Sequence, residues 1–199
     1  MRRLRTDHLD VWQLHGPFPE ELPGGKDGPV VETMLELKRQ GKVRSIGISY
    51  NNGSLGHELH PAGFGFKCAP GYLAWNVFDM MQIVYGGLTR QNEDLIPDIA
   101  KQGLGVVVRG AVKRYKPNYD ELFAQAKLGE LCEAGETPNE FLIRYALNNP
   151  GLTAMIIGTK NPDHLTANIR AANKGALAED IYGEAKRRLD SVGAVVGRR

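Results

Sequence analysis

The chain alternates short apolar runs with amphipathic stretches, and polar or glycine-rich segments join them. In one run the positions Val43, Ile46 and Ile48 are typical of a strand buried on both faces. Strands that alternate with helices predict βα units on a parallel sheet. The runs that predict strands are residues 9–15, 43–50, 78–86, 104–110 and 153–159.

Between the strands, apolar positions recur with a period near 3.6, which predicts helices. Glycines follow two of these stretches, Gly41 the first and Gly103 the second, and are expected to end those helices. The predicted helices are residues 30–42, 93–102, 120–133, 138–148, 161–173 and 180–192.

One helix start and one irregular region stand out. Thr137, Pro138 and Glu140 suit the N-cap, the first helical position and a capping box of the helix at 138–148. Residues 51–74 are rich in glycine and proline, so we expect irregular structure there, with one short helix near 55–60.

Five βα units with closing helices predict one α/β domain over residues 1–199. Parallel strands joined in this way either open into a doubly wound sheet or close into a barrel. A closed eight-stranded barrel takes about 250 residues. At 199 residues this chain is short for one.

Composition excludes little beyond charge-driven partners. The chain has 25 basic and 23 acidic residues, so its net charge of +2 does not imply binding to nucleic acid or to an anionic membrane. No apolar run is long enough to span a bilayer. The two cysteines and the absence of a secretory leader favour a cytoplasmic protein. His57 and His60 are spaced i, i+3 rather than i, i+4, so we expect no metal site.

Polar side chains end several of the predicted strands. His15 ends the first strand and should project at the carboxyl-terminal rim, where α/β folds bind ligands. Ser49, Gln82 with Tyr85, and Arg109 lie at or near the ends of later strands. Their hydroxyl, amide and guanidinium groups could converge on one polar, planar ligand. For any single one of them, a surface polar residue that stops a strand is the favoured interpretation, so the ligand site depends on all of them meeting at one rim.

The segment Gly158, Thr159 and Lys160 joins the last strand to a helix that has Pro162 in its first turn. Backbone N–H groups at a helix N-terminus, with Lys160 and His164 beside them, could hold a phosphate. The alternative is a helix-capping loop that binds no ligand. The sequence matches neither a Walker A loop nor GxGxxG. The motif is therefore compatible with a phosphate site and with a capping loop that binds no ligand.

Six segments in order, "LRTDHLDVWQLHGP", "LELKRQGKVRSIGIS", "MQIVYGGLTR", "LIPDIAKQGLGVVVRG", "PNEFLIRYALNNP" and "MIIGTKNPDHLTANIRAANKG", resemble the aldo-keto reductases. The resemblance covers nearly the whole chain. It implies an incomplete (β/α)8 TIM barrel of about five βα units plus C-terminal helices. It also implies an NADP-dependent oxidoreductase that uses NADPH to reduce small aldehydes or ketones to alcohols.

The same resemblance implies roles for the strand-end residues. His15 is similar to the active-site histidine that orients the substrate carbonyl. Ser49 and Gln82 are similar to the residues that hold the nicotinamide carboxamide, although Tyr50 replaces the usual asparagine. Arg109 replaces an aromatic residue that stacks on the nicotinamide, and its planar guanidinium could stack there too.

Further cofactor contacts follow from the resemblance. Gly110 stands where many members have a serine, and Ala167 replaces an acidic or amide residue, so that contact is absent. The remaining positions are those implied to grip the adenosine 2′-phosphate or the adenine: Gly158, Thr159, Lys160, His164 and Asn168.

In this family an aspartate, a proton-donating tyrosine and a lysine come from the first three βα units, which the resemblance implies are missing before Met1. No tyrosine here matches the donor, so we expect an impaired or inactive reductase. A non-catalytic NADP(H)-binding module or regulatory subunit is the alternative, and a rearranged scaffold without cofactor is a third. We expect a second copy or another partner to cover open barrel edges.

Overall fold

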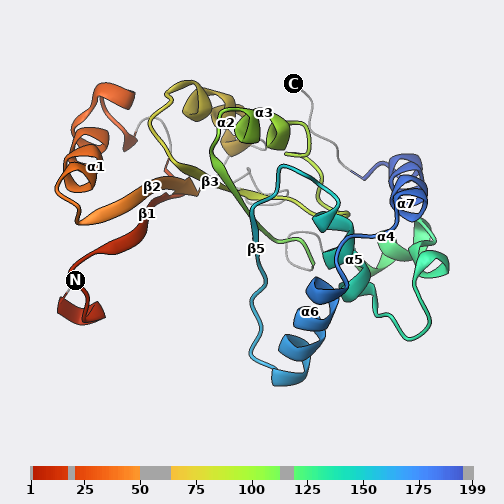
Figure 1. Ribbon diagram of the computed structural model, residues 1–199. Coiled ribbons are helices and arrows are strands. Elements are labelled where there is room, and N and C mark those ends of the chain that lie inside the picture. The colour runs from red at the N-terminus through yellow and green to blue at the C-terminus, as the bar shows by residue number, and fades with distance from the viewer. Residues whose placement is uncertain (1, 18–20, 50–63, 113–118, 195–199) are drawn as a thin grey trace. The chain divides into compact units, whose positions relative to one another are not determined.

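The computed structural model describes residues 2–17, 21–49, 64–112 and 119–194 (Figure 1). Five strands form one sheet in chain order, and β1 pairs in parallel with β2, as β2 does with β3. Helices follow the strands along the chain, which confirms the predicted α/β fold. The strands are β1 (Leu9–His15), β2 (Val43–Ser49), β3 (Met80–Val84), β4 (Gly105–Arg109) and β5 (Ala154–Ile156).

Most helices fall close to the predicted ranges; one helix is additional and one is shorter than predicted. They are α1 (Pro29–Arg39), α2 (Phe64–Ala74), α3 (Leu95–Lys101), α4 (Tyr119–Gln125), α5 (Pro138–Leu147), α6 (Pro162–Lys174) and α7 (Glu179–Ser191). Short 3-10 turns lie at Arg2–Leu4, Gly25–Asp27 and Leu128–Leu131.

The chain divides into two compact units, Met1–Ile83 with Ile99–Val107, and Val84–Asp98 with Val108–Arg199. In the first unit, α1 lies beside β2 (Figure 1). Val31 and Met34 of α1 are fully buried, as are Ile46 and Ile48 of β2. Burial of these aliphatic side chains between helix and sheet is the main force that holds α1 in place.

Asp79, just before β3, ties three elements of the first unit together. Its carboxylate accepts hydrogen bonds from Lys38 Nζ at 2.7 Å and from the backbone N–H of Ile46 at 2.8 Å. Its backbone carbonyl accepts from the N–H of Gly105 at 2.9 Å. One residue, placed directly before β3, therefore links the end of α1, the middle of β2 and the start of β4.

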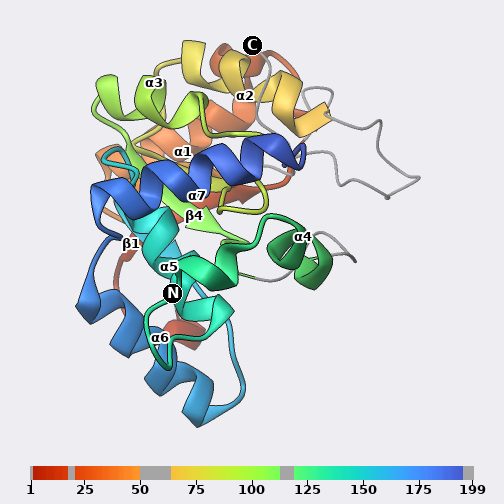
Figure 2. The same cartoon turned by 90° about the vertical axis from the view of Figure 1, so that its right-hand side faces the viewer.

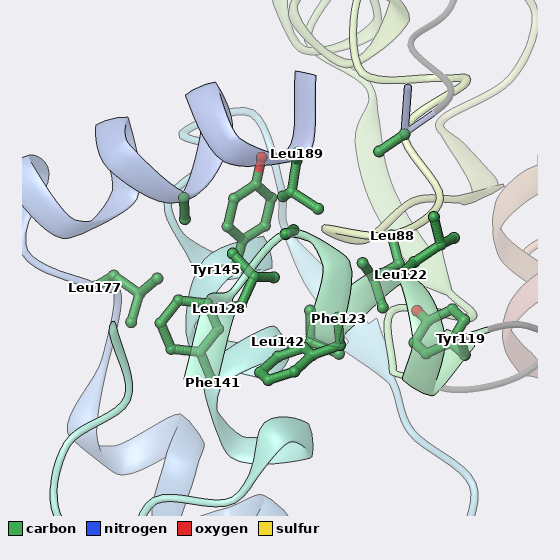
Figure 3. Packing of buried hydrophobic residues seen from close by; sticks show 13 residues of the cluster. Leu88, Tyr119, Leu122, Phe123, Leu128, Phe141, Leu142, Tyr145, Leu177 and Leu189 are labelled. Carbon is green, nitrogen blue, oxygen red and sulfur yellow. The ribbon is translucent and has the colours of Figure 1, made fainter. Parts of the chain in front are cut away.

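The second unit is built around a helical core (Figures 2 and 3). Phe123 of α4 and Phe141 of α5 meet edge to face, with ring centroids 6.1 Å apart. Tyr145 of α5 and Leu189 of α7 are both fully buried in the same cluster. The apolar faces of α4, α5 and α7 thus cover one another, and Figure 3 shows their side chains converging.

A buried ion pair adds a polar link inside this unit. Arg90 is 1% exposed, and its guanidinium donates to Glu93 at 2.7 Å and to Asp190 of α7 at 2.7 Å. A buried guanidinium is tolerated only when its donors are matched by acceptors. Arg90 therefore connects the segment after β3 to the last helix.

Helix α2 contradicts the expectation that residues 51–74 are irregular, at least over 64–74. Pro70 and Gly71 disfavour a helix locally, but Ala69, Tyr72 and Leu73 are buried, and this burial outweighs the poor propensity. The short helix expected near 55–60 and the histidines His57 and His60 lie outside the described residues.

Two other expectations need correction. The single helix expected at 120–133 is two pieces, because Lys127 takes a left-handed φ of 50° and a 3-10 turn follows, with Leu128 buried. The strand expected at 153–159 ends at Ile156. By contrast, the capping box is confirmed: Thr137 accepts from the N–H of Glu140, and Glu140 accepts from the N–H of Thr137.

Candidate functional site

The ends of three neighbouring strands place three of the candidate residues in one row. His15 of β1 is the register partner of Ser49 in β2, and Ser49 is the partner of Gln82 in β3. Register partners in a parallel sheet point to the same face, and adjacent strands lie about 4.8 Å apart. An imidazole, a hydroxyl and an amide therefore stand side by side on one face of the first unit.

Ser49 is the buried centre of this row. Its side chain is 3% exposed, and its Oγ has no hydrogen-bond partner in the part of the chain that the structure describes. His15 is exposed and Gln82 is half-buried. A buried hydroxyl left without a partner is costly, so a ligand that offers it a donor or acceptor would be stabilised there. A flat amide such as a carboxamide fits both Ser49 and Gln82.

A second row lies one layer deeper on the same face, formed by Gln13, Gly47 and Met80. A Cβ on Gly47 would lie 2.5 Å from Sδ of Met80, and one on Gly105 would lie 3.3 Å from Cβ of Met80. The two glycines make room for the Met80 side chain, which forms the floor under Ser49 and Gln82. Sequence reasoning missed this row, although the period of two along β1 and β3 places it.

The strand end at Arg109 and Gly110 belongs to the second unit. Arg109 is half-buried, and Gly110 has a left-handed φ of 71° that favours glycine. The hydroxyl of Tyr119 donates to the carbonyl oxygen of Ala111 at 3.2 Å, which anchors the backbone after Gly110. Tyr85, also considered as a ligand group, is fully buried, and burial raises its pKa well above the usual range.

The proposed phosphate loop is exposed and open. Gly158, Thr159 and Lys160 are all exposed, and an added Cβ on Gly158 would meet no heavy atom within 4 Å. Asn161 caps α6, since its Oδ1 accepts from the N–H of Asp163 at 2.8 Å. The cap side chain thus occupies one N–H of the first turn, and the acidic Asp163 lies there too.

Two candidate residues follow on α6 itself. His164 is exposed and Asn168 is half-buried, and a spacing of four residues puts them on one face of the helix. The structure therefore brings together two sets, one in each unit. His15, Ser49 and Gln82 form the strand-end row, and Gly158 to Asn168 form one loop and helix.

Neither a metal site nor a membrane span is found among the described residues. No group of three or more His, Cys, Asp or Glu side chains within those ranges could hold a metal ion. Of the helices described, none is both long and apolar enough to cross a membrane.

Comparison with solved structures identifies the fold. The holo form of an aldo-keto reductase from Bacillus halodurans superposes with a TM-score of 0.71 at 24% identity, over 100% of this chain and 63% of that chain. An aldo-keto reductase from Klebsiella pneumoniae in complex with NADPH gives a TM-score of 0.68 at 24% identity, over 94% of this chain and 60% of that chain. These neighbours are (β/α)8 barrels, and this chain corresponds to part of them.

Sequence comparison agrees with the structural one. An NADPH-dependent D-xylose reductase of Meyerozyma guilliermondii is 29% identical over 89% of this chain and 62% of its own length. The chain spans between 54% and 62% of the length of the curated relatives compared. The aldo/keto reductase family matches residues 1–187. This chain therefore belongs to the aldo/keto reductase family.

Proposed function

We propose that residues 1–199 act as one domain that binds NADP(H) and presents a small aldehyde or ketone for reduction to an alcohol. The observation that carries the proposal is the row His15, Ser49 and Gln82, placed in register at the carboxyl ends of parallel strands. Ligands of α/β folds bind at this edge. The match to a family with NADPH-bound members supports the choice of cofactor.

Each side chain of the row has a distinct task in this proposal. Ser49 and Gln82 hold the nicotinamide carboxamide, because hydroxyl and amide together supply the donors and acceptors that a carboxamide needs. His15 donates a ring N–H to the substrate carbonyl oxygen, which orients the carbonyl and stabilises negative charge as it develops. When bound, NADPH supplies the hydride.

The second unit carries the other residues that the family resemblance implies for the cofactor. Arg109 has a planar guanidinium, a group that can stack on a flat ring, and Gly110 follows it. Lys160 and the exposed N–H groups around Gly158 and Thr159 favour a phosphate, as does the positive end of α6. His164 and Asn168, one turn apart on α6, match the family positions that are implied to contact the 2′-phosphate and the adenine.

One observation favours a second candidate function, a module that binds NADP(H) without turnover. A reductase needs an acid that protonates the alkoxide, and a donor tyrosine works best when its pKa is lowered. Burial instead raises the pKa of Tyr85, Tyr119 and Tyr145 well above the usual range. Each of these tyrosines is thus a weaker acid than usual.

Cofactor binding is tested by titrating NADPH into the chain and following its fluorescence. We expect Ser49→Ala and Gln82→Ala each to weaken binding about fivefold to tenfold, the effect of one hydrogen bond. Gln102→Ala is the matched control, because Gln102 is exposed after α3. Lys160→Ala should weaken NADPH more than NADH. No binding at millimolar NADPH would contradict both candidate functions and would favour the third hypothesis, a rearranged scaffold that binds no cofactor.

Turnover separates the two candidates that bind. The assay follows loss of NADPH absorbance with a panel of small aldehydes and ketones. Reduction that falls at least about a hundredfold in His15→Asn supports the reductase, since one hydrogen-bond donor placed at a developing negative charge contributes about 10²–10³-fold. Tight NADPH binding with no consumption of any carbonyl would instead support the binding module.

A further inference from the structure

The backbone turn that follows His15 is fixed at two points. Gly16 has a left-handed φ of 63°, and its N–H donates to the carbonyl oxygen of Ser49 at 2.5 Å. The carbonyl oxygen of the next residue, Pro17, accepts a hydrogen bond from the hydroxyl of Tyr72 at 3.0 Å. The second bond joins residues 55 positions apart, so it is a tertiary contact between the end of β1 and α2.

Tyr72 is itself held firmly. Its side chain is 2% exposed, and its ring meets that of Trp75 edge to face, with centroids 5.1 Å apart. Trp75 in turn stacks on Phe78 at 6.2 Å. Trp75 also borders the loop after β1, because a Cβ on Gly25 would lie 3.5 Å from its ring. These contacts hold the Tyr72 hydroxyl against Pro17.

We propose that Tyr72 is a positioning residue that sets the direction of the His15 imidazole. Among the described residues, none makes a hydrogen bond to that ring. Its direction therefore depends on the backbone of β1 and of the turn. Gly16 is conformationally permissive and would let the turn move if it were anchored at one point only. The hydroxyl of Tyr72 supplies the second anchor. The inference rests on the proposed function only for the task assigned to His15.

Tyr72→Phe tests the anchor, because it removes the hydroxyl and keeps the ring packed. The readout is the ring resonance of His15 in the full chain by NMR, assigned among five histidines with His15→Asn. We expect the His15 signal to shift and broaden in Tyr72→Phe. Tyr119→Phe is the matched control, since it deletes another buried tyrosine hydroxyl that donates to a backbone carbonyl. The control should leave the His15 signal in place.

An unchanged His15 signal in a folded Tyr72→Phe chain would overturn the inference, as would an equal change in Tyr119→Phe. A second measurement needs no variant. In the unmodified chain we expect a slowly exchanging hydroxyl proton on Tyr72 with a cross-peak to Pro17. Absence of this proton in the native spectrum contradicts the anchor even if Tyr72→Phe does not fold.

Kinetics extend the test when the chain reduces carbonyls. The N–H of Gly16 is bonded to the carbonyl oxygen of Ser49, but Ser49 is also fixed in β2 by strand pairing. We therefore expect Tyr72→Phe to lower kcat about fivefold to tenfold and to leave the Kd for NADPH unchanged. A lower affinity for NADPH with unchanged kcat would contradict positioning of His15. A chain that never reduces a carbonyl, yet shows the shifted His15 signal, refutes the reductase and supports the anchor.

Discussion

Gly47→Ala should destabilise the floor of the strand-end row. A new Cβ would lie 2.5 Å from Sδ, 2.9 Å from Cγ and 3.0 Å from the backbone oxygen of Met80. Carbon atoms pack at about 3.5–4.0 Å, so the Met80 side chain must move by about 1 Å or more. Overpacking of this kind costs about 1–3 kcal/mol. Alanine also reduces the freedom of the unfolded chain, which adds about 0.4–1 kcal/mol to the free energy of unfolding. The net decrease in that free energy is therefore about 1–2 kcal/mol.

A double-mutant cycle isolates that contact. Met80 is 8% exposed, so Met80→Ala alone should cost about 2–5 kcal/mol. In the Met80→Ala background the clash with the side chain is gone. Gly47→Ala should then be neutral or stabilise by up to about 1 kcal/mol, the unfolded-state effect alone. The coupling energy is therefore expected to be about 1–3 kcal/mol in favour of the double variant.

Urea unfolding followed by tryptophan fluorescence measures these differences. Trp12 and Trp75 are the two tryptophans of the chain, and both lie in the first unit with Gly47 and Met80. Gly71→Ala is the matched control, because a Cβ there meets nothing within 4 Å. It should stabilise by about 0.5–1 kcal/mol as a helical glycine replaced by alanine. If Gly47→Ala costs the same with and without Met80, the packing argument is wrong.

Three further predictions concern the second unit. Arg90→Met should cost about 3–5 kcal/mol in urea unfolding, because it leaves the buried carboxylate of Glu93 without its guanidinium. Burial tends to raise the pKa of Glu140, but hydrogen bonds from Thr137 and Arg170, with the charge of Arg170, outweigh it, and the pKa is lowered from 4.5. Ionised Glu140 therefore stabilises the fold above about pH 4.5, and this stabilisation is lost as the pH falls through the lowered pKa. The difference in unfolding free energy between Glu140→Gln and the unaltered chain should accordingly vanish in acid. Burial of the thiol and, to a lesser degree, the charge of Glu136 raise the pKa of Cys132 to about 11. Its alkylation by iodoacetamide, measured by mass spectrometry, should therefore accelerate near pH 11. A midpoint near pH 9 would contradict the burial of the thiol.

Local signals accounted for several helix ends. The Thr137 to Glu140 capping box involves only neighbouring residues, so its geometry follows from the sequence alone. Gly41 and Gly103 both follow helices and have left-handed φ values of 71° and 79°, as their positions predicted. Dependence on neighbouring residues alone also explains the two predictions that were wrong. The segment at Lys127 and the helix α2 are decided by which side chains are buried, and no local pattern reports burial.

The candidate site divides along the same line. That His15, Ser49 and Gln82 end strands could be predicted, because a strand's end is a local property of the chain. That they are register partners is decided by strand pairing, which shifts every side chain to the other face if it slips by one residue. The roles of the residues in that row stay predictions until the binding and turnover experiments are done.

By itself, the sequence determined the order of the strands and of most helices, the capping box and the residue types at the strand ends, since all of these depend on neighbours within a few positions. The tertiary structure decided the rest. It brings Gly47 against Met80, buries the hydroxyl of Ser49 without a hydrogen-bond partner among the described residues, and forms the hydrogen bond from Tyr72 to Pro17. Each of these joins residues more than thirty positions apart or depends on exclusion of water, and only packing in three dimensions fixes either.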